Sequence, residues 1–199
     1  GQRLAAAPIS DTRTLPMCPP GRGGAAGASG GNEPGLKCLH GDARRAVRVL
    51  ACVLQTGSER ASNDLENHLV RKAAHRLYEQ SGVSPQDVGV AEVHDATAIG
   101  EVLQSELLGL VPMGHGGPAA ERGETRLGGR IPINPSGGLE SKGHPIGATG
   151  LGQVFELVTQ LRGEAGPRQA PVVRIALAEN GGGLAGVEEA VACLTLLGR

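Results

Sequence analysis

Apolar positions along the chain alternate between continuous runs and helical spacing. An apolar run rich in β-branched residues covers 47–54 and is broken at 56–58, which predicts a buried strand. Apolar side chains then recur at every fourth position over 65–77. Asn63 precedes them as a candidate N-cap, and Gly82 follows them as a stop signal. We therefore predict a helix between Asn63 and Gly82.

The same alternation continues through the middle of the chain. An apolar run at 88–93 predicts a second strand, which stops at His94. A helical face follows over 99–107. Residues 112–130 are rich in Gly, Pro and charge and are interpreted as a surface excursion, and 131–134 form a short strand at most.

The residue pattern in the last third of the chain predicts one helix and two strands. Small and apolar residues over 148–161 predict a helix whose first turns pack very close to a neighbour. Apolar runs at 172–177 and 191–197 predict strands, with glycines 181–183 turning between them. Strands that alternate with helices favour an α/β fold with a mostly parallel sheet and a terminal antiparallel hairpin.

The amino-acid composition divides the chain into two regions. Residues 17–35 are dominated by Gly, Pro, Ala and Ser, a composition that buries little surface. We therefore predict an irregular segment over 1–42 and one domain over 43–199.

Charge and aromatic content exclude several classes of partner. The chain has 199 residues, with 19 Lys and Arg against 20 Asp and Glu, so no basic field attracts phosphate backbones or anionic lipid. Tyr78 and Phe155 are the only aromatics, too few for base stacking. No apolar run approaches the roughly 18 residues of a membrane span, and the first residues do not resemble a signal peptide. We expect a cytoplasmic protein without nucleic-acid or membrane partners.

Cysteine spacing and glycine spacing argue against other classes of site. The chain has four cysteines, widely separated and without a CxxC pair, so neither a structural zinc site nor a disulfide scaffold is expected. The glycines fit neither a Walker A loop nor a GxGxxG motif after a strand, which makes ATP and NAD weak candidates. We predict no metal.

Three places at strand ends could carry chemistry, since sites in α/β folds gather there. His94 follows a strand and precedes a helix, where an imidazole can donate to an oxyanion or hold a water, although capping a helix or bonding a loop is the commoner role. His144 is held between glycine and proline in a segment of special backbone residues, which suits a general base better than an incidental turn. Glu179 ends a predicted strand before three glycines. This arrangement could supply a proton donor and a backbone oxyanion contact, or it could be an ordinary hairpin turn.

These segments together resemble the C-terminal half of the thiolase superfamily. The stretches that carry the resemblance are VRVLACVLQTGS, AEVHDATAIGE, NPSGGLESKGHPIGATGLGQVFELVTQLRGEAG and ALAENGGG. The His-Asp form and the long Gly-His-Pro block are most similar to the sterol-carrier-type and lipid-transfer-protein-like thiolases. The resemblance extends over about 43–199, and the earlier segment is then either a linker or a remnant of the N-terminal half.

The resemblance implies a five-layered enzyme of two similar halves, with helices on both faces of each sheet, acting on acyl-CoA thioesters. Coenzyme A enters as part of the substrate and no other cofactor is implied. His144 matches the histidine that activates a nucleophilic cysteine and helps bind the thioester oxygen. His94 matches the residue that positions a water or donor in the oxyanion hole, and the backbone of Gly181 matches a second oxyanion contact. The resemblance also suggests substrate-binding positions at Asn134, Gly143 and Pro145.

Two departures from the family pattern matter. The nucleophilic cysteine of thiolases lies in the N-terminal half, and Cys18, Cys38, Cys52 and Cys193 do not sit in its motif. The second catalytic cysteine is matched by Glu179, which could shuttle a proton if burial raised its pKa.

Three functions therefore remain open. The first is a thiolase-like acyltransferase domain acting on 3-ketoacyl-CoA thioesters in lipid or sterol metabolism, completed by an N-terminal half. The second is a thiolase-like aldolase subunit for side-chain acyl-CoA with a small partner subunit, and the third is a non-catalytic acyl-CoA-binding subunit. Because each half of the resembled fold packs on the other, we expect an exposed apolar face and either a homodimer or a complex.

Overall fold

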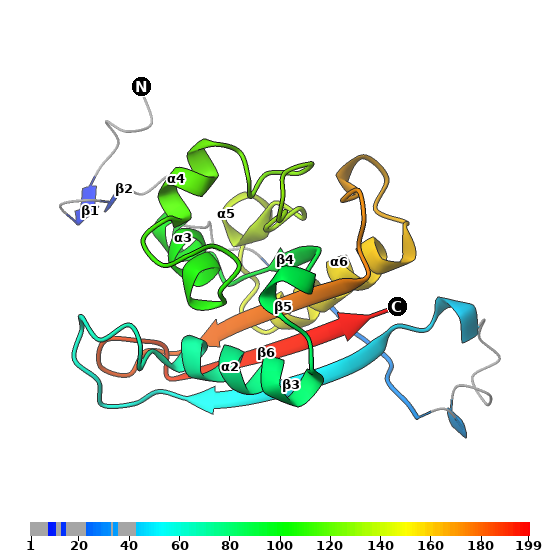
Figure 1. Ribbon diagram of the computed structural model, residues 1–199, viewed down its shortest axis with the longest axis horizontal. Helices are drawn as coiled ribbons and strands as arrows, with labels where there is room; N and C mark the ends of the chain where they lie inside the picture. The colour runs from blue at the N-terminus through cyan, green and yellow to red at the C-terminus, as the bar shows by residue number, and fades with distance from the viewer. Residues whose placement is uncertain (1–7, 11–12, 15–22, 33, 36–42) are drawn as a thin grey trace.

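The computed structural model describes residues 8–10, 13–14, 23–32, 34–35 and 43–199 (Figure 1). The strands are β1 (Pro8–Ser10), β2 (Arg13–Thr14), β3 (Arg48–Thr56), β4 (Val90–Glu92), β5 (Ile175–Gly182) and β6 (Val191–Gly198). The helices are α2 (Leu69–Ser81), α3 (Ala98–Leu107), α4 (Gly116–Glu121), α5 (Gly138–Lys142) and α6 (Thr149–Arg162). Short 3-10 turns span Ala43–Arg45, Pro85–Asp87 and Gly166–Arg168. Whether 1–42 lies outside the domain stays a prediction.

A four-stranded sheet with the order β3-β6-β5-β4 forms the centre of the fold. β4 pairs with β5 in parallel, whereas β6 is antiparallel to both of its neighbours, β3 and β5 (Figure 1). The expected terminal antiparallel hairpin is confirmed, but the expectation of mostly parallel pairing is wrong. The reason is that β6 inserts between β3 and β5 rather than adding to an edge, so strands that share a direction are kept apart.

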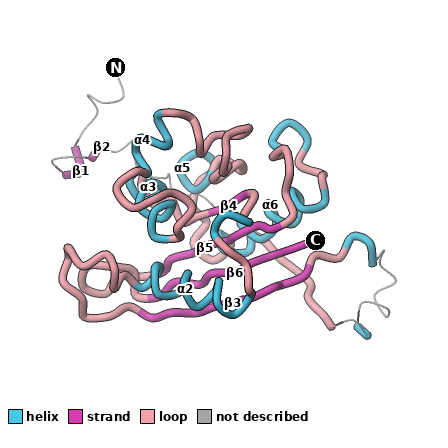
Figure 2. The backbone as a smooth tube through the Cα atoms, viewed as in Figure 1, coloured by secondary structure: helices cyan, strands magenta, loops and turns pink. Residues whose placement is uncertain are grey.

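Helices cover both faces of this sheet, as expected of an α/β fold. α2 lies across β3 and β6 (Figure 2), and α6 packs against β4 and β5 on the opposite face. Side chains of β5 alternate between the two faces: Leu177 joins the cluster under α2, whereas Ala176 and Ala178 join the cluster under α6. The two faces therefore have separate cores.

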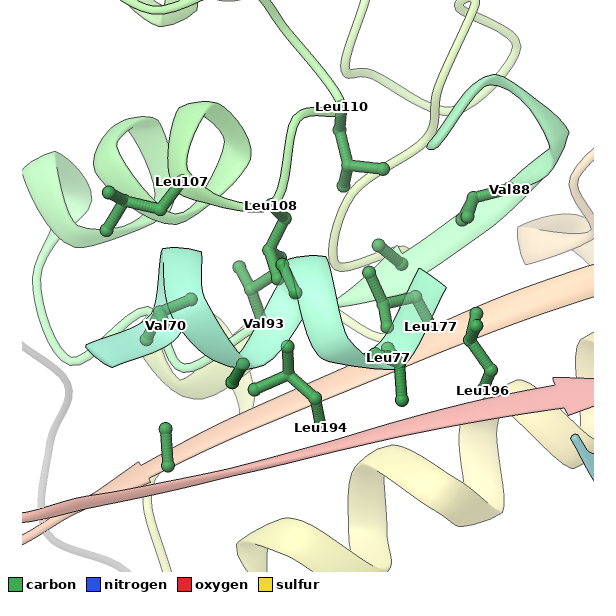
Figure 3. Close-up of a cluster of buried hydrophobic side chains, with 14 of the residues drawn as sticks. Val70, Leu77, Val88, Val93, Leu107, Leu108, Leu110, Leu177, Leu194 and Leu196 are labelled. Atoms are coloured by element: carbon green, nitrogen blue, oxygen red, sulfur yellow. The ribbon is translucent and has the colours of Figure 1, made fainter. Parts of the chain in front are cut away.

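The core under α2 is aliphatic and closely assembled (Figure 3). Leu77 from α2 lies over Leu194 and Leu196 from β6, and Leu107 and Leu108 close the cluster from the end of α3. All five side chains are buried. Because the chain has so few aromatics, leucine and valine supply the apolar surface that this face removes from water.

Helix α2 begins later than the sequence pattern predicts. His68, not Asn63, is the N-cap, and its Nδ1 accepts the Val70 N–H at 3.2 Å. The Leu69 N–H donates to a carboxylate oxygen of Glu188, which is buried and lies far along the chain. This long-range partner fixes the helix start, whereas the C-terminal cap at Gly82 is confirmed.

Three other boundaries differ from expectation. The surface excursion 112–130 contains helix α4, which buries Ala119. Strand β5 begins at Ile175 and continues through Gly182, so the predicted glycine turn starts only at Gly183, where φ is +67°. The segment 131–134 makes a single parallel bridge to β4, as expected of a short strand at most. No helix in the described part of the chain has the length and apolar character to cross a membrane.

Candidate functional site

The three predicted places meet near the carboxyl ends of β4 and β5. His94 follows β4, Glu179 is the fifth of the eight residues of β5, and His144 lies in the loop before α6. The rings of His94 and His144 stand edge to face, with centroids 4.9 Å apart and planes at 89°. The structure therefore brings together the three side chains that the sequence nominates as catalytic.

His94 is tied to β5 through its backbone and its ring. Its backbone N–H donates to Glu179 Oε2 at 2.9 Å, and its Nδ1 lies 3.0 Å from Asn180 Oδ1. An amide oxygen only accepts, so Nδ1 carries the proton of the neutral ring and Nε2 keeps its lone pair. Such a nitrogen can accept a hydrogen bond from a water and so orient that water's second proton.

His144 has a matching arrangement on the other side of the site. Its Nδ1 lies 2.7 Å from Thr149 Oγ1, and the same hydroxyl donates to the Pro145 carbonyl at 3.1 Å. Because a threonine hydroxyl has one proton, Nδ1 of His144 is the donor in the first bond, which leaves Nε2 free as a base. Burial lowers the pKa of His144, and His94 lowers it further, so the ring is neutral near pH 7.

Glu179 is a buried acid on β5, next to the backbone of His94. Its side chain is 0% exposed, and burial raises its pKa to about 8 although the bond from the His94 N–H opposes the shift. The carboxyl is therefore protonated at neutral pH. Oε2 accepts from His94, whereas Oε1 has no hydrogen-bond partner among the described residues. A neutral carboxyl with one unsatisfied oxygen is suited to donate a proton to a ligand.

The first turns of α6 approach this group closely, as its small residues predict. A Cβ at Gly150 would lie 3.3 Å from the Asn180 side-chain nitrogen. Gln153, one turn on, is fully buried, and its Nε2 donates to the Glu179 carbonyl at 2.8 Å. α6 therefore holds both residues 179 and 180 of β5. Gln153 is a supporting residue that the sequence analysis missed, because a buried glutamine in a helix carries no motif.

The predicted substrate-binding residues lie around the two histidines. Asn134 is buried with φ at +51°, and its amide accepts from the Val93 N–H and donates to Glu101, both at 2.8 Å. Its polar atoms thus join β4 to α3. Gly143 caps α5 at φ +96°, a conformation that favours glycine, and Pro145 follows His144 directly. Their contact with substrate stays a prediction.

Gly181 lies inside β5, opposite Ala192 of β6, rather than in a turn. Its missing side chain leaves room for Glu189, since a Cβ at 181 would lie 2.8 Å from Glu189 Cγ. Glu189 is held by Gln104, whose Nε2 donates to it at 3.0 Å. The oxyanion role of the Gly181 backbone is not tested by this geometry and stays a prediction.

A charged network that the sequence analysis missed supports the loop before His144. Glu92, buried at the end of β4, accepts from the Ser136 N–H at 3.0 Å and from its hydroxyl at 2.6 Å. Lys142 Nζ lies 2.6 Å from the same hydroxyl and 3.4 Å from Glu92. Burial raises the pKa of Glu92, and the Lys142 charge opposes this shift. A serine and a lysine within NPSGGLESK were the available signals, but the pattern does not reveal their shared partner.

Asp95 connects the end of β4 to helix α5. It lies just before α3 but does not cap that helix, because Thr97 does so by accepting the Gly100 N–H at 3.1 Å. Asp95 instead accepts from the Leu139 and Glu140 N–H groups at the start of α5. The carboxylate occupies the space that a side chain at 138 would need, which explains the glycine there.

A cleft of about 360 Å³ lies beside the segment that contains Lys142, Gly143 and Pro145. Pro145, Ala148 and Phe155 give it apolar walls, and Lys142 and Arg168 also line it. Within the described residues, no group of three or more His, Cys, Asp or Glu side chains is arranged to hold a metal ion.

A mixed sheet with helices on both faces and paired histidines at its strand ends defines a thiolase-like domain. The chain belongs to the thiolase C-terminal domain-like family, whose model matches residues 53–195. The resemblance that the sequence suggests is therefore confirmed.

Relatives among known proteins agree with this assignment. The chain is 43% identical to sterol carrier protein 2 of Oryctolagus cuniculus over 185 residues, which cover 89% of this chain and 33% of that protein. It is 39% identical to non-specific lipid-transfer protein-like 2 of Caenorhabditis elegans, covering 94% of this chain and 47% of that protein. It is 48% identical to acetyl-CoA acetyltransferase of Methanothermobacter thermautotrophicus, covering 57% and 30%. The chain thus spans between about a third and a half of the length of these relatives.

A solved structure shares the fold. The Ltp2-ChsH2(DUF35) aldolase superposes with a TM-score of 0.63 at 22% identity, covering 77% of this chain and 39% of that chain. At this identity the likeness supports the fold alone.

Proposed function

We propose that this domain is the acid–base half of a thiolase-like acyltransferase that acts on 3-ketoacyl-CoA thioesters. The observation that carries the proposal is the pair of imidazoles 4.9 Å apart beside a protonated, fully buried Glu179. Each ring has its Nδ1 engaged, which leaves both Nε2 atoms free to serve one ligand. An N-terminal half, in another chain or in a longer product, supplies the nucleophilic cysteine.

The proposed steps assign one proton task to each side chain. His144 Nε2 takes the proton of the incoming cysteine thiol while the sulfur attacks the 3-keto carbon of the substrate. The resulting oxyanion is stabilised by the His144 imidazolium and by a water held on His94 Nε2. The bond between C2 and C3 then breaks, and neutral Glu179 donates its proton to the departing acyl-CoA enolate. Coenzyme A thiol finally gives its proton to the Glu179 carboxylate and displaces the acyl group, and the departing cysteine thiolate recovers its proton from the His144 imidazolium.

An exposed apolar surface supports the need for a partner. Phe155 on α6 is 64% exposed, and Ile146, directly after the His144-Pro145 pair, is 83% exposed. Large apolar side chains that gather on one surface are typical of an interface. A homodimer or a small partner subunit would also cover this surface.

Aldolase chemistry is a second candidate, and Glu179 is the observation that favours it. A carboxyl in place of a cysteine supplies a proton donor and acceptor without a nucleophile. Retro-aldol cleavage of a side-chain acyl-CoA needs such an acid–base group and no covalent intermediate. An acyl-CoA-binding subunit without turnover would need neither histidine.

Thiolysis by a chimera tests the proposal. The matching segment of the Methanothermobacter acetyl-CoA acetyltransferase is replaced by that of this chain, and cleavage of acetoacetyl-CoA by coenzyme A is followed. We expect turnover, and we expect His144→Ala to abolish it. The matched control is His75→Ala, which removes an exposed histidine of α2. Full activity of the His144→Ala chimera would contradict the catalytic assignment.

A further inference from the structure

Two cysteines that the proposed chemistry does not use lie side by side on the sheet. Cys52 on β3 is opposite Thr195 of β6, and Cys193 on β6 is opposite Leu54. Cys52 and Cys193 are therefore diagonal neighbours on one sheet face. Their Sγ atoms are 3.9 Å apart, Cys52 is exposed, and Cys193 is half-buried. Solvent and small reagents can reach this pair of thiols.

We propose that Cys52 and Cys193 are a thiol-disulfide exchange site that closes reversibly with a low-molecular-weight disulfide such as glutathione disulfide. The exposed Cys52 thiolate attacks one sulfur of the reagent, whose disulfide bond breaks and releases one glutathione thiolate. The Cys193 thiolate then attacks the Cys52 sulfur of the mixed disulfide. A protein disulfide forms, and the second glutathione leaves. The two protons of the cysteine thiols end on two molecules of glutathione.

The position of the pair in the sheet explains why closure is feasible and reversible. A disulfide bond is about 2 Å long, so the two sulfur atoms must approach by about 2 Å. β3 is an edge strand of the sheet, and rotation of the exposed Cys52 side chain with a small shift of that edge brings the atoms together. Diagonal neighbours are further apart than the partners of most disulfides. The bond is therefore strained, and strained disulfides are readily reduced.

The pair also lies next to the candidate site. Cys193 is directly opposite Asn180 on β5, and Asn180 is the residue whose Oδ1 bonds the ring of His94. Closure of the disulfide draws Cys193 toward the edge strand and away from this neighbour. We therefore expect the ring signals of His94 to shift in nuclear magnetic resonance spectra when the disulfide forms. The disulfide itself does not depend on the proposed acyl-CoA chemistry.

Thiol counting on the folded full chain tests this proposal. Cys18 and Cys38 fall outside the described residues and are replaced by Cys18→Ser and Cys38→Ser, which leaves only the pair. The protein is equilibrated with mixtures of reduced and oxidised glutathione, quenched, unfolded and alkylated, and its intact mass is measured. We expect loss of both alkylatable thiols without a glutathione adduct, a peptide linking residues 52 and 193, and full recovery on reduction with dithiothreitol.

Two controls make the result specific. Adding Cys193→Ser removes the resolving thiol, so Cys52 should then accumulate as a stable glutathione adduct. The same equilibration in denaturant should close the disulfide at a much lower fraction, because the unfolded chain does not hold the sulfurs together. Peptide mapping of the unsubstituted chain checks that the same pair closes without the serine replacements.

Three outcomes would overturn the proposal. They are a persistent adduct on Cys52 with Cys193 present, a disulfide-linked dimer in place of the internal bond, and two free thiols across the whole glutathione series.

Discussion

The two faces of the central sheet are covered by other side chains to different extents. On the α2 face, Leu77, Leu194 and Leu196 are fully buried in a continuous aliphatic cluster. On the opposite face, α6 covers β4 and β5, while Leu54 of the edge strand is 64% exposed. The α2 face is therefore closed, whereas the opposite face is open to solvent at the edge strand.

The candidate site includes side chains from both faces of the sheet. Glu179 shares the α2 side of β5 with Leu177, whereas the next residue, Asn180, points to the α6 side. His94 bonds both of them, one through its backbone and one through its ring. The closed face thus holds the acid of β5, while the next side chain along the strand reaches the ring of His94 from the open face.

The largest expected effect concerns the acid at the end of the closed face. Between the ordinary glutamate pKa of about 4.5 and the folded value of about 8, Glu179 is ionised when unfolded but protonated when folded. Unfolding therefore releases a proton, and the free energy of unfolding falls as pH rises through this window, by about 1.4 kcal/mol per unit and on the order of 5 kcal/mol in all.

Glu179→Gln stays neutral and should remove this contribution. Urea unfolding at several values between about pH 5 and pH 8 measures it, with the unsubstituted chain as reference. An identical slope of stability against pH in both proteins would show that the closed face does not hold a protonated acid.

The next effect compares the two faces directly with one substitution on each. Leu194→Ala on the closed face should lower the free energy of unfolding by about 2–5 kcal/mol, because it leaves a cavity among buried side chains. Leu54→Ala on the open face should change it by less than about 0.5 kcal/mol but reduce the binding of a hydrophobic dye. Urea unfolding and dye fluorescence measure the two results. Equal losses of stability would mean that both faces are equally covered.

Local patterns predicted most elements, and long-range contacts explain the errors. The apolar run at 47–54 is a strand because its residue types suit a strand wherever it pairs, but the prediction that this strand is buried is wrong. It forms the edge strand β3, in which only Val53 is buried. By contrast, no local pattern shows that β6 inserts beside β3, or that Glu188 from a distant turn fixes the start of α2. Both depend on tertiary pairing, which overrides local preference.

The site shows the same division. His94, His144 and Glu179 were found because strand ends and special backbone residues mark them, and the structure brings them together. Glu92 and Gln153 were missed because their importance comes from burial and from partners far along the chain. Their residue types at those positions are typical of ordinary strands and helices.

The most direct test of the acid–base site is proton exchange at the α-carbon of an acyl-CoA. The chimera described above is incubated with acetyl-CoA in deuterated water, and deuterium entering the acetyl group is followed by nuclear magnetic resonance. The account predicts exchange by the parent chimera that increases toward pH 8, because only ionised Glu179 can take the α-proton. It predicts loss of exchange in both Glu179→Gln and His144→Ala, with His75→Ala unaffected. Undiminished exchange in both site variants would contradict the claim that these side chains form one acid–base site.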